Sequence, residues 1–186
     1  MPNKNHALRY IYLITLLTIG GVSLAQKDNP HINQIRARFQ TINNATDYKI
    51  LTVSTEQYYE ITGIYLYPSV ESYEAIGYVK NKKVYKIVEL GYTASQKMTT
   101  EYYFWDNLLI FIYCKTEIAS YDSISTSLDF NKLTTIAETR LYIRSSKLIK
   151  RFDTGSETYY FEPGKKVGNV VNSPDKLKKW FLKMSK

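Results

Sequence analysis

Apolar residues change their spacing along this chain, and the changes separate helices from strands. Between Pro30 and Asn44 they recur every three or four positions, which predicts an amphipathic helix with Asn29 as its N-cap. From Tyr48 to Tyr160 the chain is rich in Tyr, Ile, Val, Thr and Phe with regular polar breaks, which predicts consecutive antiparallel strands. A second helix is predicted from Ser173 and Pro174 onward, with an apolar side of Leu177, Trp180, Phe181 and Met184.

One sequence pattern occurs three times within the strand region. Residues 78–90 read YVKNKKVYKIVEL, residues 103–115 read YFWDNLLIFIYCK, and residues 142–153 read YIRSSKLIKRFD. Each copy joins two apolar runs through a polar centre, so each is predicted to be a β-hairpin with its turn at 80–83, 105–108 or 144–147. A weaker fourth copy is predicted at 160–165, where Pro163 and Gly164 supply the turn.

Alternation of side chains along the strands predicts two unlike faces of the sheet. One face is apolar and is predicted to be the core that the helices cover; it carries Val79, Val84, Tyr102, Phe104, Leu109, Phe111, Leu141, Ile143, Leu148 and Phe152. The other face is rich in tyrosine and charge and is predicted to be partly open; it carries Glu74, Tyr78, Tyr85, Glu89, Glu101, Tyr103, Glu138, Arg140, Tyr142 and Arg151. The predicted fold is therefore α+β: an antiparallel meander of about six to eight strands with an N-terminal and a C-terminal helix packed on it.

The first 25 residues have the pattern of a secretory signal peptide. Lys4 and Arg9 precede an uncharged, mostly apolar run at 10–19, and small residues lead up to Ala25. This pattern predicts cleavage after Ala25, leaving a single domain at 26–186 in the periplasm or outside the cell. A membrane anchor is the weaker interpretation, because the apolar run is shorter than the ~20 residues that span a bilayer.

Composition narrows the classes of function without selecting one. Cys114 is the only cysteine, so the chain forms no internal disulfide, and its position in an apolar run predicts a buried hydrophobe. The formal charge is +8, and it falls to +6 when Lys4 and Arg9 leave with the signal peptide. A basic chain favours acidic partners such as anionic polysaccharide, lipid head groups, nucleic acid or an acidic protein.

Few residues offer catalytic or cofactor chemistry. His31 is the only histidine after residue 25, and no metal-ligand spacing, nucleophile elbow or phosphate-binding loop occurs, so no cofactor and no metal are predicted. Glu101 and Glu138 share a predicted face, and two carboxylates are sufficient for glycoside hydrolysis. Ion pairing of these acids with Arg140 and Arg151 is the favoured interpretation, because such cross-strand pairs are ordinary on a solvated sheet.

The C-terminal helix and the tyrosines allow several partners. Lys176, Lys179, Trp180 and Lys183 fit a helix at a membrane surface, but packing of this helix on the sheet is favoured. Interleaved tyrosines and basic residues also stack on bases or sugars. Because an exported protein seldom meets nucleic acid, an envelope protein or a carbohydrate is the predicted partner.

The helix pattern Ile32, Ile35, Phe39, Ile42, Asn43 followed by hairpins of the form Tyr-Tyr-Phe-x-Asp/Asn-x-Leu, best seen at 102–108, resembles short uncharacterised secreted proteins of Gram-negative bacteria. The hairpins are also weakly similar to MORN-type repeats, although this chain lacks their repeating glycine. The resemblance implies an architecture and no catalytic residue.

These patterns together predict a non-catalytic, exported binding module, in a narrower version an inhibitor or immunity-type protein of the cell envelope. The alternatives are a small glycan hydrolase that uses Glu101 and Glu138, or a peripheral envelope protein held by its basic helix. The predicted binding face consists of Tyr78, Tyr85, Glu101, Tyr103, Glu138, Arg140, Tyr142 and Arg151.

Overall fold

The computed structural model describes residues 29–63, 71–123, 126–155 and 172–185. The chain divides into two compact units, Met1–Asn33 and Gln34–Lys186. In the first unit Asn29 caps a helix, because its Oδ1 accepts a hydrogen bond of 3.0 Å from the backbone N–H of His31. The predicted signal peptide and the fourth hairpin at 160–165 lie outside the described residues, and a single domain from residue 26 stays a prediction.

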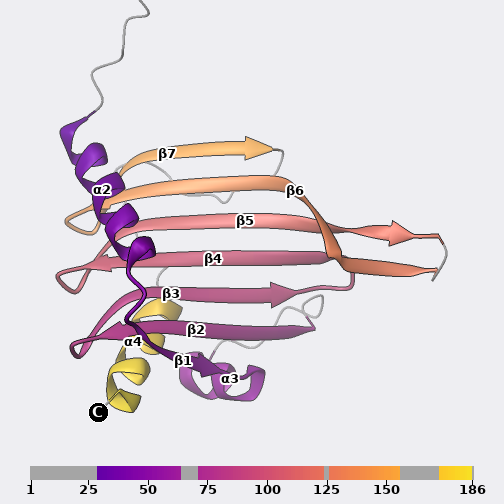
Figure 1. Cartoon of the computed structure of the whole chain (residues 1–186), viewed down its shortest axis with the longest axis horizontal. Helices are drawn as coiled ribbons and strands as arrows, with labels where there is room; N and C mark the ends of the chain where they lie inside the picture. The colour runs from indigo at the N-terminus through magenta and orange to yellow at the C-terminus, as the bar shows by residue number, and fades with distance from the viewer. Residues whose placement is uncertain (1–28, 64–70, 124–125, 156–171, 186) are drawn as a thin grey trace, which may run out of the picture. The chain divides into compact units, whose positions relative to one another are not determined.

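The second unit is built on one antiparallel sheet whose strands lie in sequence order (Figure 1). This arrangement confirms the predicted α+β meander with a helix at each end. The strands are β1 (Lys49–Val53), β2 (Ser72–Lys80), β3 (Lys83–Tyr92), β4 (Gln96–Trp105), β5 (Leu108–Asp122), β6 (Ser127–Arg144) and β7 (Lys147–Gly155). The helices are α2 (Pro30–Asn44), α3 (Thr55–Thr62) and α4 (Asn172–Met184).

The three repeated segments are hairpins of the same geometry. Each turn has two central residues with positive φ, between 49° and 64°, as in the type I′ turns that suit the twist of a hairpin. Each hairpin also has a register shift directly before its turn, at Tyr78/Val79, Tyr103/Phe104 and Tyr142/Ile143. The predicted turns are therefore confirmed, and each is accompanied by a bulge. The central residues are Asn81 and Lys82, Asp106 and Asn107, and Ser145 and Ser146.

The shared bulge corrects the faces that strict alternation predicted. One extra residue after each turn moves the following side chains to the opposite side of the sheet. Phe111, predicted on the core face, is the partner of Tyr103 across the strands, and Phe152 is the partner of Arg140. These two rings therefore lie on the side of the sheet that carries the tyrosines. We call that side, with Tyr78, Tyr103 and Tyr142, the tyrosine face.

Two charged residues move in the other direction for the same reason. Arg151, predicted in the binding face, pairs with Leu141 on the opposite side, where its Nε lies 2.6 Å from a carboxylate oxygen of Asp153. Glu89 pairs with Ala75 and is only 7% exposed. Both belong to the side we call the core face, so neither lies on the tyrosine face.

The core face is covered by α3 and α4. Leu177 and Phe181 of α4 are fully buried in the main hydrophobic cluster. Phe181 lies directly against Gly77 of β2, where an added Cβ would come within 2.6 Å of its ring. This packing confirms that the apolar side of the C-terminal helix faces the sheet. Among the described residues, no helix is both long and apolar enough to cross a bilayer.

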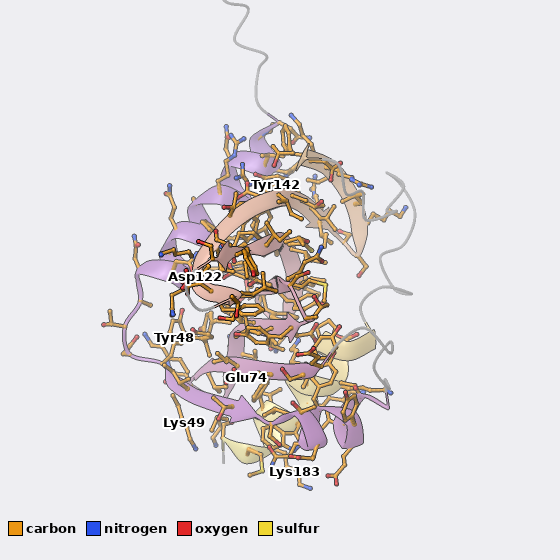
Figure 2. The ribbon with its side chains drawn as sticks, turned by 90° about the vertical axis from the view of Figure 1, so that its right-hand side faces the viewer. Tyr48, Lys49, Glu74, Asp122, Tyr142 and Lys183 are labelled. Atoms are coloured by element: carbon orange, nitrogen blue, oxygen red, sulfur yellow. The ribbon has the colours of Figure 1, made fainter. Side chains whose placement is uncertain are left out.

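The N-terminal helix packs on the other side from the one predicted. Residues 34–44 of α2 lie on the tyrosine face, and Figure 2 shows α2 and α4 on opposite sides of the sheet. Beneath the helix, Tyr103 is 0% exposed and Tyr142 is 5% exposed. The prediction that these two tyrosines form an open surface is therefore wrong, because the apolar stripe of α2 covers them.

Helix α3 was not predicted. Ser54 accepts a hydrogen bond from the backbone N–H of Gln57, whose side chain accepts one from the backbone N–H of Ser54. Gly63 ends the helix in the left-handed conformation at φ 65°. A capping box followed by a glycine thus defines this short helix between β1 and β2.

Candidate functional site

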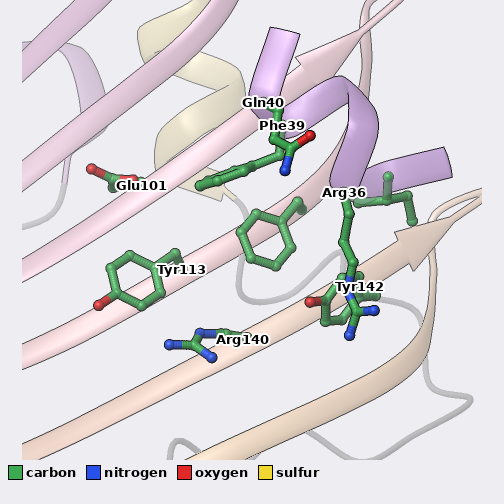
Figure 3. Close-up of a pocket in the computed structure, with 9 residues that line it drawn as sticks. Arg36, Phe39, Gln40, Glu101, Tyr113, Arg140 and Tyr142 are labelled. Carbon is green, nitrogen blue, oxygen red and sulfur yellow. The ribbon is translucent and has the colours of Figure 1, made fainter. Parts of the chain in front are cut away.

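Helix α2 covers the tyrosine face only at the end of the sheet where the three hairpin turns lie. A groove runs along the side of the helix (Figure 3). The groove has a volume of about 480 Å³, within the range of ligand sites in proteins. The helix supplies one wall, and strands β4, β5 and β6 supply the floor and the opposite wall. Its lining residues are Ile35, Arg36, Phe39, Gln40, Glu101, Phe111, Tyr113, Arg140 and Tyr142.

A row of aromatic rings joins the helix to the sheet. Tyr103, Phe111 and Tyr142 are cross-strand partners, so their side chains stand next to one another on one face. The ring centroid of Phe39 on α2 lies 4.8 Å from that of Tyr103 and 5.4 Å from that of Phe111. Phe111 and Tyr142 are 5.0 Å apart in the same measure. The groove therefore has a rigid aromatic floor whose rings are fixed by the sheet register.

Polar groups hold the end of α2 over this row. Glu101 accepts a hydrogen bond from the hydroxyl of Tyr103 and lies 3.0 Å from the Nζ of Lys86. Lys86 also donates to Oδ1 of Asn43, near the end of α2, at 3.2 Å. Burial, and then the hydrogen bond to Glu101, raise the pKa of the Tyr103 hydroxyl, so it remains a donor.

The neighbouring row is more open and carries a second network. The hydroxyl of Tyr113 donates to Oε1 of Glu138 at 2.6 Å, and Nη2 of Arg140 donates to Oε2 of the same carboxylate at 2.7 Å. The guanidinium of Arg140 also lies 5.8 Å from the ring centroid of Tyr113. Burial and the bond to Glu138 raise the pKa of Tyr113. This network fixes the orientation of both Tyr113 and Arg140 at the groove.

Two arginines from different elements line the same groove. Arg36 extends from the exposed side of α2 and places its guanidinium carbon 6.0 Å from the ring centroid of Tyr142. Arg140 lines the groove from β6 (Figure 3). Gln40 adds an exposed amide from the helix, and Glu101 adds a carboxylate from β4. The groove thus combines aromatic rings, cations and hydrogen-bonding groups, which is the composition of a binding site.

The structure brings together only part of the predicted binding face. Glu101, Arg140 and Tyr142 line the groove, and Glu138 supports it. Tyr103 lies beneath α2. Tyr78 and Tyr85 stand farther along the sheet, where the ring of Tyr48 lies 5.9 Å and 5.7 Å from theirs, and Arg151 is on the core face.

Six lining residues were not among the predicted binding residues. Phe111 was assigned to the wrong face because the bulge was not foreseen, and Tyr113 shares its side of β5. Ile35, Arg36, Phe39 and Gln40 belong to the predicted helix, but a helical stripe does not indicate which sheet face it will cover. The alternation of side chains that selected Glu101, Arg140 and Tyr142 was the signal for this region.

The two carboxylates considered for hydrolysis are both engaged. Glu101 accepts from Tyr103 and pairs with Lys86, and Glu138 accepts from Tyr113 and Arg140. These partners make both acids parts of fixed hydrogen-bond networks. Among the described residues, no three His, Cys, Asp or Glu side chains come together as a metal site.

The other candidate groups, Cys114 and the lysines of α4, are engaged in packing and in hydrogen bonds within the fold. Cys114 is buried on the core face, and burial raises the pKa of its thiol to about 12, which makes it unreactive at neutral pH. On α4, Lys176 donates to the carbonyl of Thr62, and Lys178 donates to that of Asn107 at 2.6 Å while lying 4.9 Å from the ring centroid of Phe104. Two lysines of the basic helix therefore hold it against the fold.

No protein-family model, curated protein or solved structure matches this chain.

Proposed function

We propose that this chain is a non-catalytic binding module, exported after cleavage following Ala25, whose ligand occupies the groove between α2 and strands β4–β6. The observation that supports the proposal is the groove itself, a hollow of about 480 Å³ with an aromatic floor. The helix packs over Tyr103 and Tyr142, and the hollow lies along its side, between Arg36 and Gln40 of the helix and Tyr113 and Arg140 of the sheet. A scaffold that fixes its lining residues loses little conformational entropy when a ligand binds.

Binding is the activity that these side chains support best. Hydrogen bonds and ion pairs fix the side chains of Tyr113 and Arg140 at the groove. The two carboxylates considered as acid and base, Glu101 and Glu138, are already engaged with other side chains. An inhibitor or immunity-type protein of the envelope would use the same groove to hold part of its target. We therefore place recognition at the groove and not at the half-buried tyrosines Tyr78 and Tyr85.

A steric block of the groove tests this proposal. Gln40→Trp adds a large ring from an exposed helical position that lines the groove, while Gln34→Trp adds the same ring to α2 outside it. The chain is immobilised and used to capture partners from an envelope fraction. Capture should be lost with Gln40→Trp and kept with Gln34→Trp, and both variants should melt like the wild type. Equal capture by wild type and Gln40→Trp would remove the groove as the binding site.

A further inference from the structure

We propose that the end of the sheet formed by the three hairpin turns docks on an anionic lipid surface. We call this region, residues 80–83, 105–108 and 144–147, the turn end. None of its residues lines the groove, so the inference goes beyond the proposed function and does not depend on it. Its support comes from the residues that close the hairpins, the apolar groups of the central turn, and the opposite charge of the two ends of the sheet.

The three turns lie together at one end of the sheet (Figure 1). Because the strands follow one another in an antiparallel order, the turns of β2–β3, β4–β5 and β6–β7 all fall on the same edge. Successive turns are two strands apart, which is about 10 Å. A flat surface can therefore meet all three turns at once. Their twelve residues include five basic side chains and one acid, namely Lys80, Lys82, Lys83, Arg144 and Lys147 against Asp106.

The two outer hairpins are closed by pairs of like charge. Lys80 is the cross-strand partner of Lys83, and Arg144 is the partner of Lys147. Like charges directly opposite each other destabilise a strand pair, so these pairs do not serve the fold. The Nζ of Lys80 lies 2.6 Å from a carboxylate oxygen of Asp47. Within the part of the chain that the structure describes, no acid pairs with Lys83 or Lys147, and both lysines are exposed to an anion outside the molecule.

The central hairpin carries apolar groups at the equivalent positions. Trp105 is the partner of Leu108, whose side chain is 59% exposed. The half-buried ring of Trp105 has its centroid 5.3 Å from the guanidinium carbon of Arg38. The residues that follow the three turns are thus Lys83, Leu108 and Lys147, an exposed leucine between two exposed lysines. This combination suits the interface of an anionic bilayer, where lysines meet lipid phosphates and apolar groups enter the headgroup region. A soluble polyanion offers the charge without the apolar layer.

The other end of the sheet has the opposite charge. It comprises α3 and the connections β3–β4 and β5–β6 with their adjoining residues. Its described residues include two lysines, Lys97 and Lys132, and a larger number of acids: Glu56, Glu60, Glu71, Asp122 and Asp129. This polarity turns the basic end toward an anionic surface and keeps the acidic end away from it.

Vesicles test the inference. The purified chain is sedimented with phosphatidylcholine vesicles that contain or lack phosphatidylglycerol, and we expect binding only with phosphatidylglycerol, weakening as salt rises. Lys83→Gln combined with Lys147→Gln should weaken binding about fivefold for each lysine removed. Lys97→Gln combined with Lys132→Gln makes the same change in net charge at the other end and should leave binding intact. Equal losses in the two double variants would mean that net charge alone is responsible and would overturn the assigned surface.

A pair of leucines distinguishes a bilayer from a soluble polyanion. Leu108→Ser should weaken vesicle binding severalfold and leave binding to heparin unchanged. Leu128→Ser alters a leucine that is 36% exposed near the other end of the sheet, and it should affect neither. If heparin binds and phosphatidylglycerol vesicles do not, or if Leu108→Ser leaves vesicle binding unchanged, a bilayer is the wrong partner and the inference is overturned.

Discussion

Replacement of Gly77 by alanine should dislodge the C-terminal helix from the sheet. A Cβ at this position would lie 2.6 Å from Cγ of Phe181 and 2.7 Å from both Cδ atoms, whereas ordinary carbon contacts are about 3.5–4.0 Å. The ring would have to retreat by about 1 Å, but it is fully buried between α4 and β2. Overpacking of this kind costs about 1–3 kcal/mol, partly offset by the greater strand propensity of alanine.

The melting temperature, measured by circular dichroism, should decrease by about 2–4 °C for each kcal/mol of stability that is lost. Gly91→Ala is the matched control, because its Cβ would lie farther from its neighbours, at 3.2 Å from Cε1 of Tyr73 and 3.3 Å from the terminal methyl of Met98. The loss of stability in this control should be clearly smaller.

A double-mutant cycle isolates the contact between the two residues. Phe181→Ala alone should cost about 3–5 kcal/mol because it leaves a cavity in the core. In that background Gly77→Ala should no longer be destabilising, since the ring that opposed it is gone. If the losses from the two substitutions simply add, Gly77 and Phe181 do not limit each other, and the described packing of α4 is wrong.

Three further predictions concern alkaline stability, turn geometry and processing. The free energy of unfolding should fall above about pH 9, because burial raises the pKa of Cys114 from the ordinary 9.0 to about 12 and raises the pKa of Tyr102 above the ordinary 10.0. The stability that these neutral buried groups contribute is complete below the ordinary pKa values and is lost as pH rises, because the unfolded chain then ionises first. If the free energy of unfolding measured in urea stays constant from pH 8 to 11, the buried positions of both groups are contradicted. Lys82→Gly should raise the free energy of unfolding by about 0.5–1 kcal/mol in a urea titration, because Lys82 has φ 57° and glycine adopts this conformation without strain; a loss of stability would argue against the type I′ turn. Expression of the full chain in an exporting host should give a mature protein that begins at Gln26 by intact mass, and retention of residues 1–25 would refute the predicted cleavage.

The sequence was sufficient to predict the hairpins because their signals are local. Paired polar residues such as Asp106-Asn107 between apolar runs specify a tight turn wherever it lies in the fold. The spacing of Ile35, Phe39 and Ile42 specifies a helix in the same way. Both kinds of signal concern residues only a few positions apart, and the structure confirms both.

The composition of the candidate site depended on features that alternation does not reveal. A single bulge residue after Asp106-Asn107 places Phe111 on the tyrosine face. The corresponding bulge in the β6–β7 hairpin places Arg151 on the core face. Burial of Tyr103 depended on which side α2 would cover, and apolar residues occur on both sides of the sheet. By contrast, α3 was missed although Ser54, Gln57 and Gly63 form a recognisable helix start and stop.

The strict sequence order of the strands has a consequence for how the chain acquires its structure. Every strand pairs with its immediate neighbours along the chain, so the sheet can grow one ribbon at a time through short loop closures. Docking of Phe181 on Gly77 is different, because it joins segments about a hundred residues apart and must await the whole C-terminal part. With this topology we expect the sheet to form progressively from neighbouring strands and α4 to dock last.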